Sequence, residues 1–161
     1  MSLPCTSLTF PCVNLFSNIY VKFYALLPFQ LQSSISKDFP GVNEKNLERY
    51  LKILTLFRNV CAHNERLYSF RIQIDFPDTI LHQKLNIPKK GNQYLSGKRD
   101  LFGLIIAFRY LLPKQDFLEF KRILIGIINK YTKNSGQISE SSLLHMMGSP
   151  TNWKNITRYR I

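Results

Sequence analysis

The stretch that decides the fold is residues 43–64, NEKNLERYLKILTLFRNVCAHN. Its apolar side chains recur three or four positions apart, which is the spacing of one face of an α-helix. That face comprises Leu47, Tyr50, Leu51, Leu54, Phe57 and Cys61. Asn43 offers a side-chain cap at the start of the helix. Asn64 accommodates the left-handed conformation that stops helices, so we expect the helix to end near residues 63–65.

Helical patterns continue downstream of this stretch. The expected helices span about residues 98–112, 114–133 and 139–147, and a terminal turn contains Trp153 and Ile156. Pro113 stops the first of them, which is apolar nearly all round and is therefore the expected centre of the core. Strand-like alternation is confined to residues 68–74, a pattern compatible with a lone extended edge. The sequence predicts an all-α helical bundle that forms a single domain over residues 1–161.

The stretch after the motif helix has a different character. Residues 70–97 contain Pro77, Pro88 and Gly91 and mix polar with apolar side chains, so we expect an irregular loop there. A loop of this length inside a compact domain is uncommon and is usually either functional or mobile. Two interpretations stay open: the loop borders the working surface, or it is a disordered spacer.

The charge balance indicates an anionic partner. Lys and Arg total 22 against 10 acidic residues, which gives a net charge of +12 and a sequence pI near 9.8. Such an excess is typical of proteins that bind nucleic acids. A merely basic protein and a protein attracted to acidic membranes are the alternatives. We favour nucleic acid and expect no membrane association, because the basic residues are spread over the chain and form no basic amphipathic helix.

The cysteines and the N-terminal stretch bear on location. Three cysteines without a Cys-x-x-Cys pair support neither a disulfide framework nor a cysteine zinc site, so a reducing cytoplasm is the expected compartment. Residues 3–29 are apolar, but prolines, asparagines and Lys22 interrupt them and no cleavage site follows. We therefore expect this stretch to contribute to the core and not to a signal peptide or a membrane span.

The most reactive pair of side chains lies at the end of the first predicted helix. Arg58 and His63 are separated by four residues. An arginine guanidinium is a permanent cation that can make two hydrogen bonds to a phosphate group. A histidine exchanges a proton near neutral pH and can act as a general acid or base. The pair therefore suits the cleavage of a phosphodiester bond in RNA.

Helical geometry restricts how this pair can act. Five residues at about 100° each leave Arg58 and His63 about 140° apart, so a straight helix cannot aim both at one atom. Asn59 and His63 lie one turn apart on one face. Three arrangements stay open. The stem of Arg58 bends around the helix, the helix unwinds after Ala62, or two copies of the chain share one site across a two-fold axis.

Structural explanations for the same residues also exist. Arg58 lies about 20° from Leu47 on the helical wheel, so we expect it inside the apolar stripe, where a charge is costly unless it is paired or used. A buried ion pair would account for it, as would an arginine whose head reaches water. The acidic candidates for such a pair are Glu48, Glu65 and Asp75. A histidine at a helix C-terminus is favoured by the helix dipole alone.

Two segments of the chain resemble a known family. Residues 57–68, FRNVCAHNERLY, look like the "LRN-x-x-AH-x-x-RLW" signature of the Abi (abortive infection) family, in its AbiD/AbiF-like group of bacterial phage-defence proteins. Residues 147–156, MGSPTNWKNI, resemble the closing "MGFP-x-NW-x-x-I" segment of that family. The two segments lie in the same order as in the family.

The resemblance implies membership of the HEPN superfamily of helical bundles. Many of these proteins are metal-independent endoribonucleases that dimerise, so that two motifs form one RNA-cutting site. By this resemblance Arg58 and His63 match the defining pair of the motif, Asn59 matches the polar residue after the arginine, and Arg66 matches a downstream basic position. The implied partners are RNA, a second copy of the chain, and an antitoxin or small regulatory RNA. No metal or cofactor is implied, and we expect His82 and His145 to be structural or exposed.

The chain also departs from the family pattern. Family members are usually longer, and this chain looks like their C-terminal part, so we expect a truncated member. Tyr68 stands where tryptophan is common, and Ser149 stands where phenylalanine is common. A non-catalytic RNA-binding module is therefore the second candidate function, and an inactive dimerisation fragment is the third. Binding would act through phosphate contacts of Arg66, Lys98, Arg99, Lys121 and Arg122.

Overall fold

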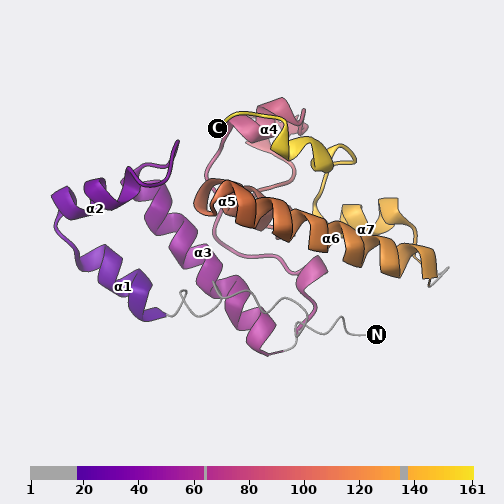
Figure 1. The fold of residues 1–161 in the computed structure, drawn as a ribbon, viewed down its shortest axis with the longest axis horizontal. Helices are drawn as coiled ribbons and strands as arrows, with labels where there is room; N and C mark the ends of the chain where they lie inside the picture. Colours follow the sequence, from indigo (N-terminus) through magenta and orange to yellow (C-terminus); the bar gives the residue numbers. More distant parts are fainter. Residues whose placement is uncertain (1–17, 64, 135–137) are drawn as a thin grey trace.

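The computed structural model describes residues 18–63, 65–134 and 138–161, and these are mostly helical (Figure 1). The helices are α1 (Asn18–Leu26), α2 (Phe29–Ser36), α3 (Glu44–Ala62), α4 (Ile80–Lys84), α5 (Leu101–Leu111), α6 (Lys114–Asn134) and α7 (Glu140–Met147). Two 3-10 helices, η3 (Leu67–Ser69) and η4 (Trp153–Thr157), and two short strands, β1 (Lys89–Lys90) and β2 (Gln93–Tyr94), complete the described part. The predicted all-α class is confirmed.

Helix α3 begins and ends where the sequence predicts. The side chain of Asn43 accepts a hydrogen bond of 2.8 Å from the backbone N–H of Asn46, which satisfies one of the free donors of the first turn. At the other end, the N–H of Glu65 donates to the carbonyl of Val60 at 3.1 Å, a hydrogen bond typical of helix termination. Asn64 itself lies outside the described residues.

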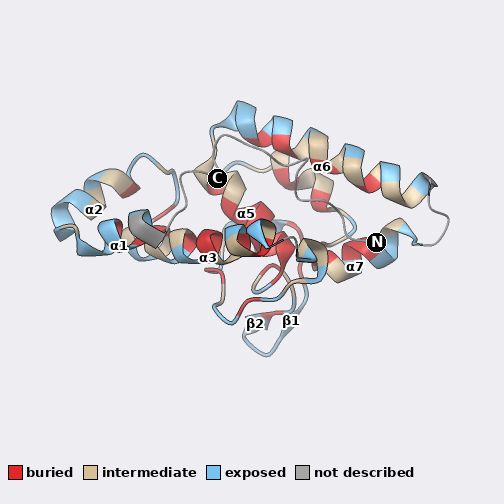
Figure 2. Cartoon of the chain, turned by 90° about the horizontal axis from the view of Figure 1, so that it is seen from below, coloured by how far each residue is buried: buried red, intermediate tan, exposed pale blue. Residues whose placement is uncertain are grey.

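Helix α3 is the central element that two groups of helices share. Helices α1 and α2 contact it on one side, and α5 and η3 contact it on another. In Figures 1 and 2, α1 and α2 lie on one side of α3, and α5, α6 and α7 lie on the other. The buried side chains of α3 are Leu47, Tyr50, Ile53, Leu54, Thr55, Phe57 and Val60. The C-terminal turn of α3, which carries the predicted motif, is covered on fewer sides than the middle of the helix.

Helix α5 forms the centre of the core, as predicted from its composition. Its residues 101–107 are all buried, together with Tyr110. The helix begins at Leu101 and not near residue 98, because the Asp100 side chain caps it by accepting a hydrogen bond of 2.9 Å from the N–H of Gly103. The same carboxylate accepts from the N–H of Gly97. Burial raises the pKa of Asp100, and the two backbone hydrogen bonds act in the opposite direction.

The C-terminal segment closes over this cap. Gly148 ends α7 in the left-handed conformation with φ of 71°, and a Cβ at this position would clash with the Asp100 carboxylate. Trp153 and Ile156 are fully buried in the core. The segment that resembles the end of the Abi family therefore has a packing role, since its glycine permits a close approach and its apolar side chains fill the core.

Residues 70–97 include α4 and a β-hairpin, and the remainder has no regular structure. The segment contributes Ile72, Phe76, Leu81 and Leu85 to the core, which argues against a disordered spacer. The extended edge considered for residues 68–74 is wrong. Residues 67–69 form η3, which the N–H of Phe70 closes by donating to Leu67, and the backbone hydrogen bonds to the distant residues 98 and 99 come from Ile72 and Phe76. Two isolated hydrogen bonds do not make a strand ladder.

The N-terminal stretch contributes less to the core than its composition suggested. In α1, Val21 and Tyr24 are buried, whereas Phe23 and Leu26 are 62% and 84% exposed. The exposed apolar side chains of α1 and α2 are Tyr20, Phe23, Leu26, Phe29 and Leu31. The expectation that this stretch is core is therefore confirmed for Val21 and Tyr24 and wrong for Tyr20, Phe23, Leu26 and Phe29, and residues 1–17 lie outside the described part. In that part, no helix is both long enough and apolar enough to cross a bilayer.

Candidate functional site

The predicted motif residues lie at the C-terminal end of α3. Arg58 and His63 are exposed and Asn59 is partly buried. The Arg58 guanidinium donates a hydrogen bond of 3.3 Å from Nη1 to Oδ1 of Asn59, so these two polar groups are in contact. The imidazole of His63 has no partner among the described side chains. An arginine, an amide and a histidine are thus accessible together on one turn and a half of helix.

His63 keeps a helical hydrogen bond although it is the C-cap residue that follows α3. Its backbone N–H donates to the carbonyl of Asn59 at 3.0 Å, which is the four-residue hydrogen bond of an α-helix. Its φ of −94° and ψ of 10° then turn the chain away from the helix. The Cα atoms of Arg58 and His63 therefore remain about 140° apart around the axis. Within one chain, only the long stem of Arg58 can shorten the gap between the two functional groups.

The expectation that Arg58 lies inside the apolar stripe is wrong. The buried arc of α3 is centred on Tyr50 and Phe57, because η3 and α5 cover that side. Arg58 lies about 90° from the centre of this arc and is exposed. It forms no ion pair with the proposed acids in the described part. Among those acids, Glu48 pairs with Lys52 and Asp75 pairs with Arg99. Arg58 is thus available to a ligand without breaking an ion pair in the described part, and its one hydrogen bond to a side chain there is to its neighbour Asn59.

The predicted nucleic-acid contacts near the motif fall into two groups. Arg66 is exposed between α3 and η3 and has no partner among the described side chains. Lys98 and Arg99 hold the loop of residues 70–97 in place. Lys98 donates to the carbonyl of Phe76 and pairs with Asp78. The side chain of Lys98 is only 15% exposed. Of the three, Arg66 is therefore the cation whose charge is not paired with an acidic side chain of the described part.

The two predicted contacts on α6 also differ from one another. Lys121 donates from Nζ to the carbonyl of Lys154 at 2.5 Å and to Oγ1 of Thr157 at 2.8 Å, so it fastens η4 to α6. Burial lowers the pKa of Lys121, and the nearby charge of Arg158 adds to this effect. Lys121 has a structural role that leaves few donors for a phosphate.

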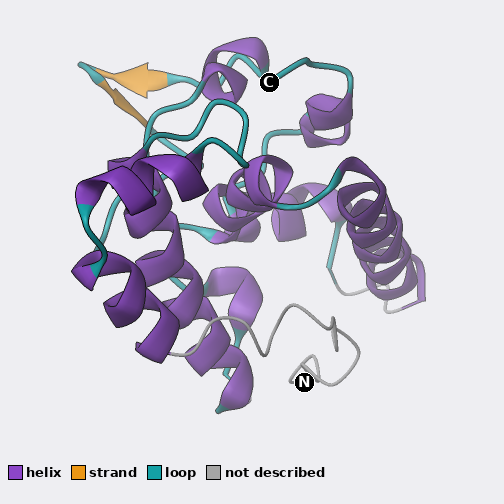
Figure 3. Cartoon of the chain, turned by 60° about the vertical axis from the view of Figure 1, so that its left-hand side comes forward, coloured by secondary structure: helices purple, strands orange, loops and turns teal. Residues whose placement is uncertain are grey.

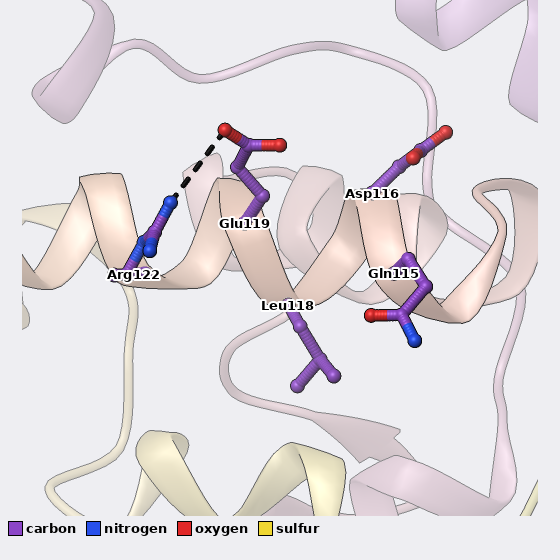
Figure 4. Close-up of a pocket in the computed structure, with 5 residues that line it drawn as sticks. All are labelled: Gln115, Asp116, Leu118, Glu119 and Arg122. Atoms are coloured by element: carbon purple, nitrogen blue, oxygen red, sulfur yellow. Dashed lines mark ion pairs between the residues drawn. The ribbon is translucent and has the colours of Figure 1, made fainter.

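Arg122 lies on the outer face of α6. It lines an open hollow with Gln115, Asp116, Leu118 and Glu119 (Figure 4). Its guanidinium is 3.6 Å from the carboxylate of Glu119. Two acidic side chains in this hollow oppose an anionic ligand. All five lining residues belong to α6, so the hollow is separate from the motif at the end of α3.

The other two histidines differ in environment. His145 is exposed on α7. His82 is fully buried, and its Nδ1 accepts a hydrogen bond of 3.2 Å from the N–H of Thr79 while Nε2 is 3.1 Å from the carbonyl of Gly97. This arrangement fits a neutral ring with the proton on Nε2, and burial lowers the pKa of His82. In the described part, no three His, Cys, Asp or Glu side chains cluster to hold a metal ion.

The sequence-based prediction omitted three exposed lysines. Lys84, Lys89 and Lys90 belong to α4 and β1 and form no ion pair with the described residues. The available signal was charge, because residues 79–99 contain no Asp or Glu. Residue identity alone did not separate these lysines from Lys98 and Arg99 in the same segment, whose charges are paired.

Comparison with known proteins supports part of the family resemblance. Residues 13–69 match the family described as "Abi-like protein". The matched range contains α1, α2, α3, η3 and the Arg58 to His63 motif, and it leaves the closing segment around Trp153 outside. The match supports the Abi family, and the role that it suggests is abortive infection, a form of phage defence. No curated protein and no solved structure matches the chain.

Proposed function

We propose that this chain is a metal-independent endoribonuclease of an abortive-infection system. Arg58, Asn59 and His63 form its catalytic site, and RNA is its substrate. The observation that carries the proposal is the accessible Arg-x4-His motif at the end of α3, inside the range that matches the Abi-like family. The net charge of +12 favours a polyanionic substrate. The odd number of cysteines without a Cys-x-x-Cys pair favours the cytoplasm, where RNA is found.

The proposed reaction is an internal attack by the ribose. The 2′-oxygen bonds to the adjacent phosphorus while the bond from phosphorus to the 5′-oxygen breaks. The products are a 2′,3′-cyclic phosphate and a 5′-hydroxyl. One imidazole of His63 takes the proton of the 2′-hydroxyl or gives a proton to the leaving 5′-oxygen. The Arg58 guanidinium binds the phosphate and stabilises the charge that develops on it. Asn59 contacts Arg58 and would fix its orientation.

A second copy of the chain would complete this site. Two histidines can supply the acid and the base at once, and a two-fold axis would place two motifs together. The angle of about 140° between Arg58 and His63 on one helix favours this arrangement. Residues 18–36 carry a single charge, Lys22, so two copies of a chain with net charge +12 would repel each other little there. Residues 18–36 also include the exposed apolar side chains of α1 and α2, which favour the association of two copies.

Cleavage of labelled RNA by matched variants tests the proposal. We expect His63→Ala to lower the rate by roughly 10² to 10⁴, which is the usual contribution of a general acid or base. His145→Ala is the control, because His145 is also an exposed histidine near a helix C-terminus. Wild-type cleavage should persist in EDTA and should fail when the 2′-hydroxyls are replaced by hydrogen. Loss of cleavage in EDTA, or equal cleavage by both variants, contradicts the proposal.

A binding module without catalysis is the second candidate function. The observation in its favour is the separation of Arg58 and His63 around α3, which a lone chain can bridge only through the long stem of Arg58. Growth arrest on expression that survives Arg58→Ala and His63→Ala would favour this function. Sedimentation velocity, which reports the oligomeric state, also distinguishes the nuclease from the binding module. The nuclease proposal expects a dimer that Phe23→Ser weakens, and a strictly monomeric chain favours the binding module.

A further inference from the structure

A β-hairpin projects from the body of the molecule and presents two lysines on its first strand, β1. Strands β1 and β2 pair antiparallel, with Lys89 opposite Tyr94 and Lys90 opposite Gln93. Figures 2 and 3 show the two strands extending away from the helices. The turn contains Gly91 with φ of 60°, and a Cβ at this position would meet no atom within 4 Å. The tip of the hairpin is thus surrounded by solvent.

The root of the hairpin is fixed in the core. Ile87 and Tyr94 are 5% and 7% exposed, and the ring of Tyr94 packs on that of His82 with centroids 4.7 Å apart. Backbone hydrogen bonds join Leu95 to Pro88 at 2.9 Å and Ile87 to His82 at 3.0 Å. The Nζ of Lys89 lies 4.3 Å from the centre of the Tyr94 ring, which restrains this side chain. A rigid root holds the exposed cations in a defined position, so less entropy is lost when they bind a ligand.

The charge of this region is not compensated locally. Residues 79–99 contain Lys84, Lys89, Lys90, Lys98 and Arg99 and no acidic residue. The charges of Lys98 and Arg99 are paired with Asp78 and Asp75. The three remaining cations, Lys84, Lys89 and Lys90, are exposed and have no ion pair in the described part. We refer to these three as the hairpin lysines.

We propose that the hairpin lysines form a phosphate-binding surface that holds the backbone of the RNA substrate. This assignment rests on the proposed nuclease function for the identity of the polymer. Lysine ammonium groups bind phosphates as point charges, without reading the base sequence. Single-stranded RNA and DNA of equal length should therefore bind with similar affinity. A membrane surface is a poorer fit, because the tip between β1 and β2 is Gly91-Asn92 and offers no apolar side chain to insert.

Fluorescence anisotropy with a labelled 20-nucleotide RNA tests the assignment. The full chain carries His63→Ala throughout, so that no cleavage confuses the binding. The test variant is Lys84→Gln/Lys89→Gln/Lys90→Gln. The control is Lys114→Gln/Lys130→Gln/Lys133→Gln, which removes the same charge from exposed positions of α6. A third variant, with arginine in place of Lys84, Lys89 and Lys90, keeps the positive charge. Thermal unfolding confirms that each variant folds.

The assignment predicts weaker binding for the test variant alone. Removal of three phosphate contacts should reduce the slope of log affinity against log salt by about 2 and weaken binding by about 10-fold to 100-fold in 0.1 M salt. The control should change the affinity far less, and the arginine variant should bind like the parent. Equal loss in test and control variants overturns the assignment, because net charge then explains the binding. Unchanged RNA binding with lost binding to phosphatidylserine vesicles overturns it in favour of a membrane.

The result separates this assignment from the nuclease proposal. If wild-type chain fails to cut RNA but the test variant binds RNA more weakly than the control, the nuclease proposal fails and the hairpin surface stands. If wild type cuts RNA and the test variant shows unchanged binding, the nuclease proposal stands and the hairpin surface fails.

Discussion

The body of the molecule, formed by α5, α7, η4 and residues 70–97, differs from its N-terminal layer, formed by α1 and α2. In the body, Trp153 and Phe102 are fully buried, and the buried polar groups of Asp100 and His82 have hydrogen-bond partners. In the N-terminal layer, Phe23 and Leu26 are more exposed than buried. The difference teaches that the body contributes most of the free energy of folding, whereas the N-terminal layer and the end of α3 expose side chains that are available to other molecules.

The largest effect should come from opening the core of the body. Trp153→Ala should lower the free energy of unfolding by about 3–5 kcal/mol, because Trp153 is fully buried and a cavity would remain. Phe23→Ser in the N-terminal layer should change it by less than about 0.5 kcal/mol when both chains are measured as monomers, at protein concentrations too low for the proposed dimer to form. Urea unfolding followed by circular dichroism measures both values. A similar loss in the two variants would show that the N-terminal layer is as tightly packed as the body.

Two glycines should respond with opposite signs to the same substitution. Gly148→Ala should destabilise the chain by about 1–3 kcal/mol or more, because φ is 71° and the new Cβ would meet Asp100. Gly126→Ala should stabilise it by roughly 0.5–1 kcal/mol, because Gly126 lies inside α6 with no atom near a new Cβ. Thermal melts give both signs. A stabilising Gly148→Ala would disprove the close approach of the end of α7 to the Asp100 cap of α5.

Acid should weaken the body through His82. Burial lowers the pKa of His82 in the folded state below the value of about 6.5 expected when the chain is unfolded, so the unfolded chain binds the extra proton. The stability contributed by neutral His82 is therefore present above about pH 6.5 and is lost as pH falls below it, by up to about 1.4 kcal/mol per pH unit. His82→Gln should show a smaller decrease between pH 7 and 5 in urea unfolding. If the free energy of unfolding fell equally steeply with pH in wild type and in His82→Gln, the buried, neutral state of the His82 ring would be contradicted.

The smallest effect on folding should come from the motif itself. Arg58→Ala and His63→Ala should each change the free energy of unfolding by less than about 0.5 kcal/mol, because both side chains are exposed and neither is held by an ion pair in the described part. Loss of activity in these variants would then be attributable to chemistry. A loss of 2 kcal/mol or more would show a structural role that the exposed positions do not explain.

Local signals predicted most of the helices from the sequence. The cap at Asn43, the helix start at Ser139 and the stop at Pro113 act over a few residues, and periodicity acts over one helix. The cap at Asp100 is equally local, since it accepts from the N–H of Gly103, and the prediction of a helix start near residue 98 overlooked it. The direction of the buried face of α3 depends on η3 and α5, which are distant in sequence, so the exposure of Arg58 could not be predicted.

In the candidate site, too, some features follow from the local sequence and others depend on residues that are distant in the chain. The residue types of the motif and its place at a helix end follow from the sequence around Arg58 and His63. The pairing of Lys98 and Arg99 with Asp78 and Asp75 depends on how residues 70–97 fold back, which no local pattern specifies. Apolar composition alone suggested a core role for the N-terminal stretch, but burial requires neighbours, and α3 covers only one side of α1.

The most direct test of the central claim is the chemistry of the RNA ends. RNA incubated with the purified chain should carry 2′,3′-cyclic phosphates and 5′-hydroxyls at the cut sites, and His63→Ala protein of unchanged stability should produce neither. Ends with a 5′-phosphate, or cyclic phosphates produced equally by His63→Ala, would contradict a site in which the exposed end of α3 supplies the acid, the base and the phosphate-binding cation.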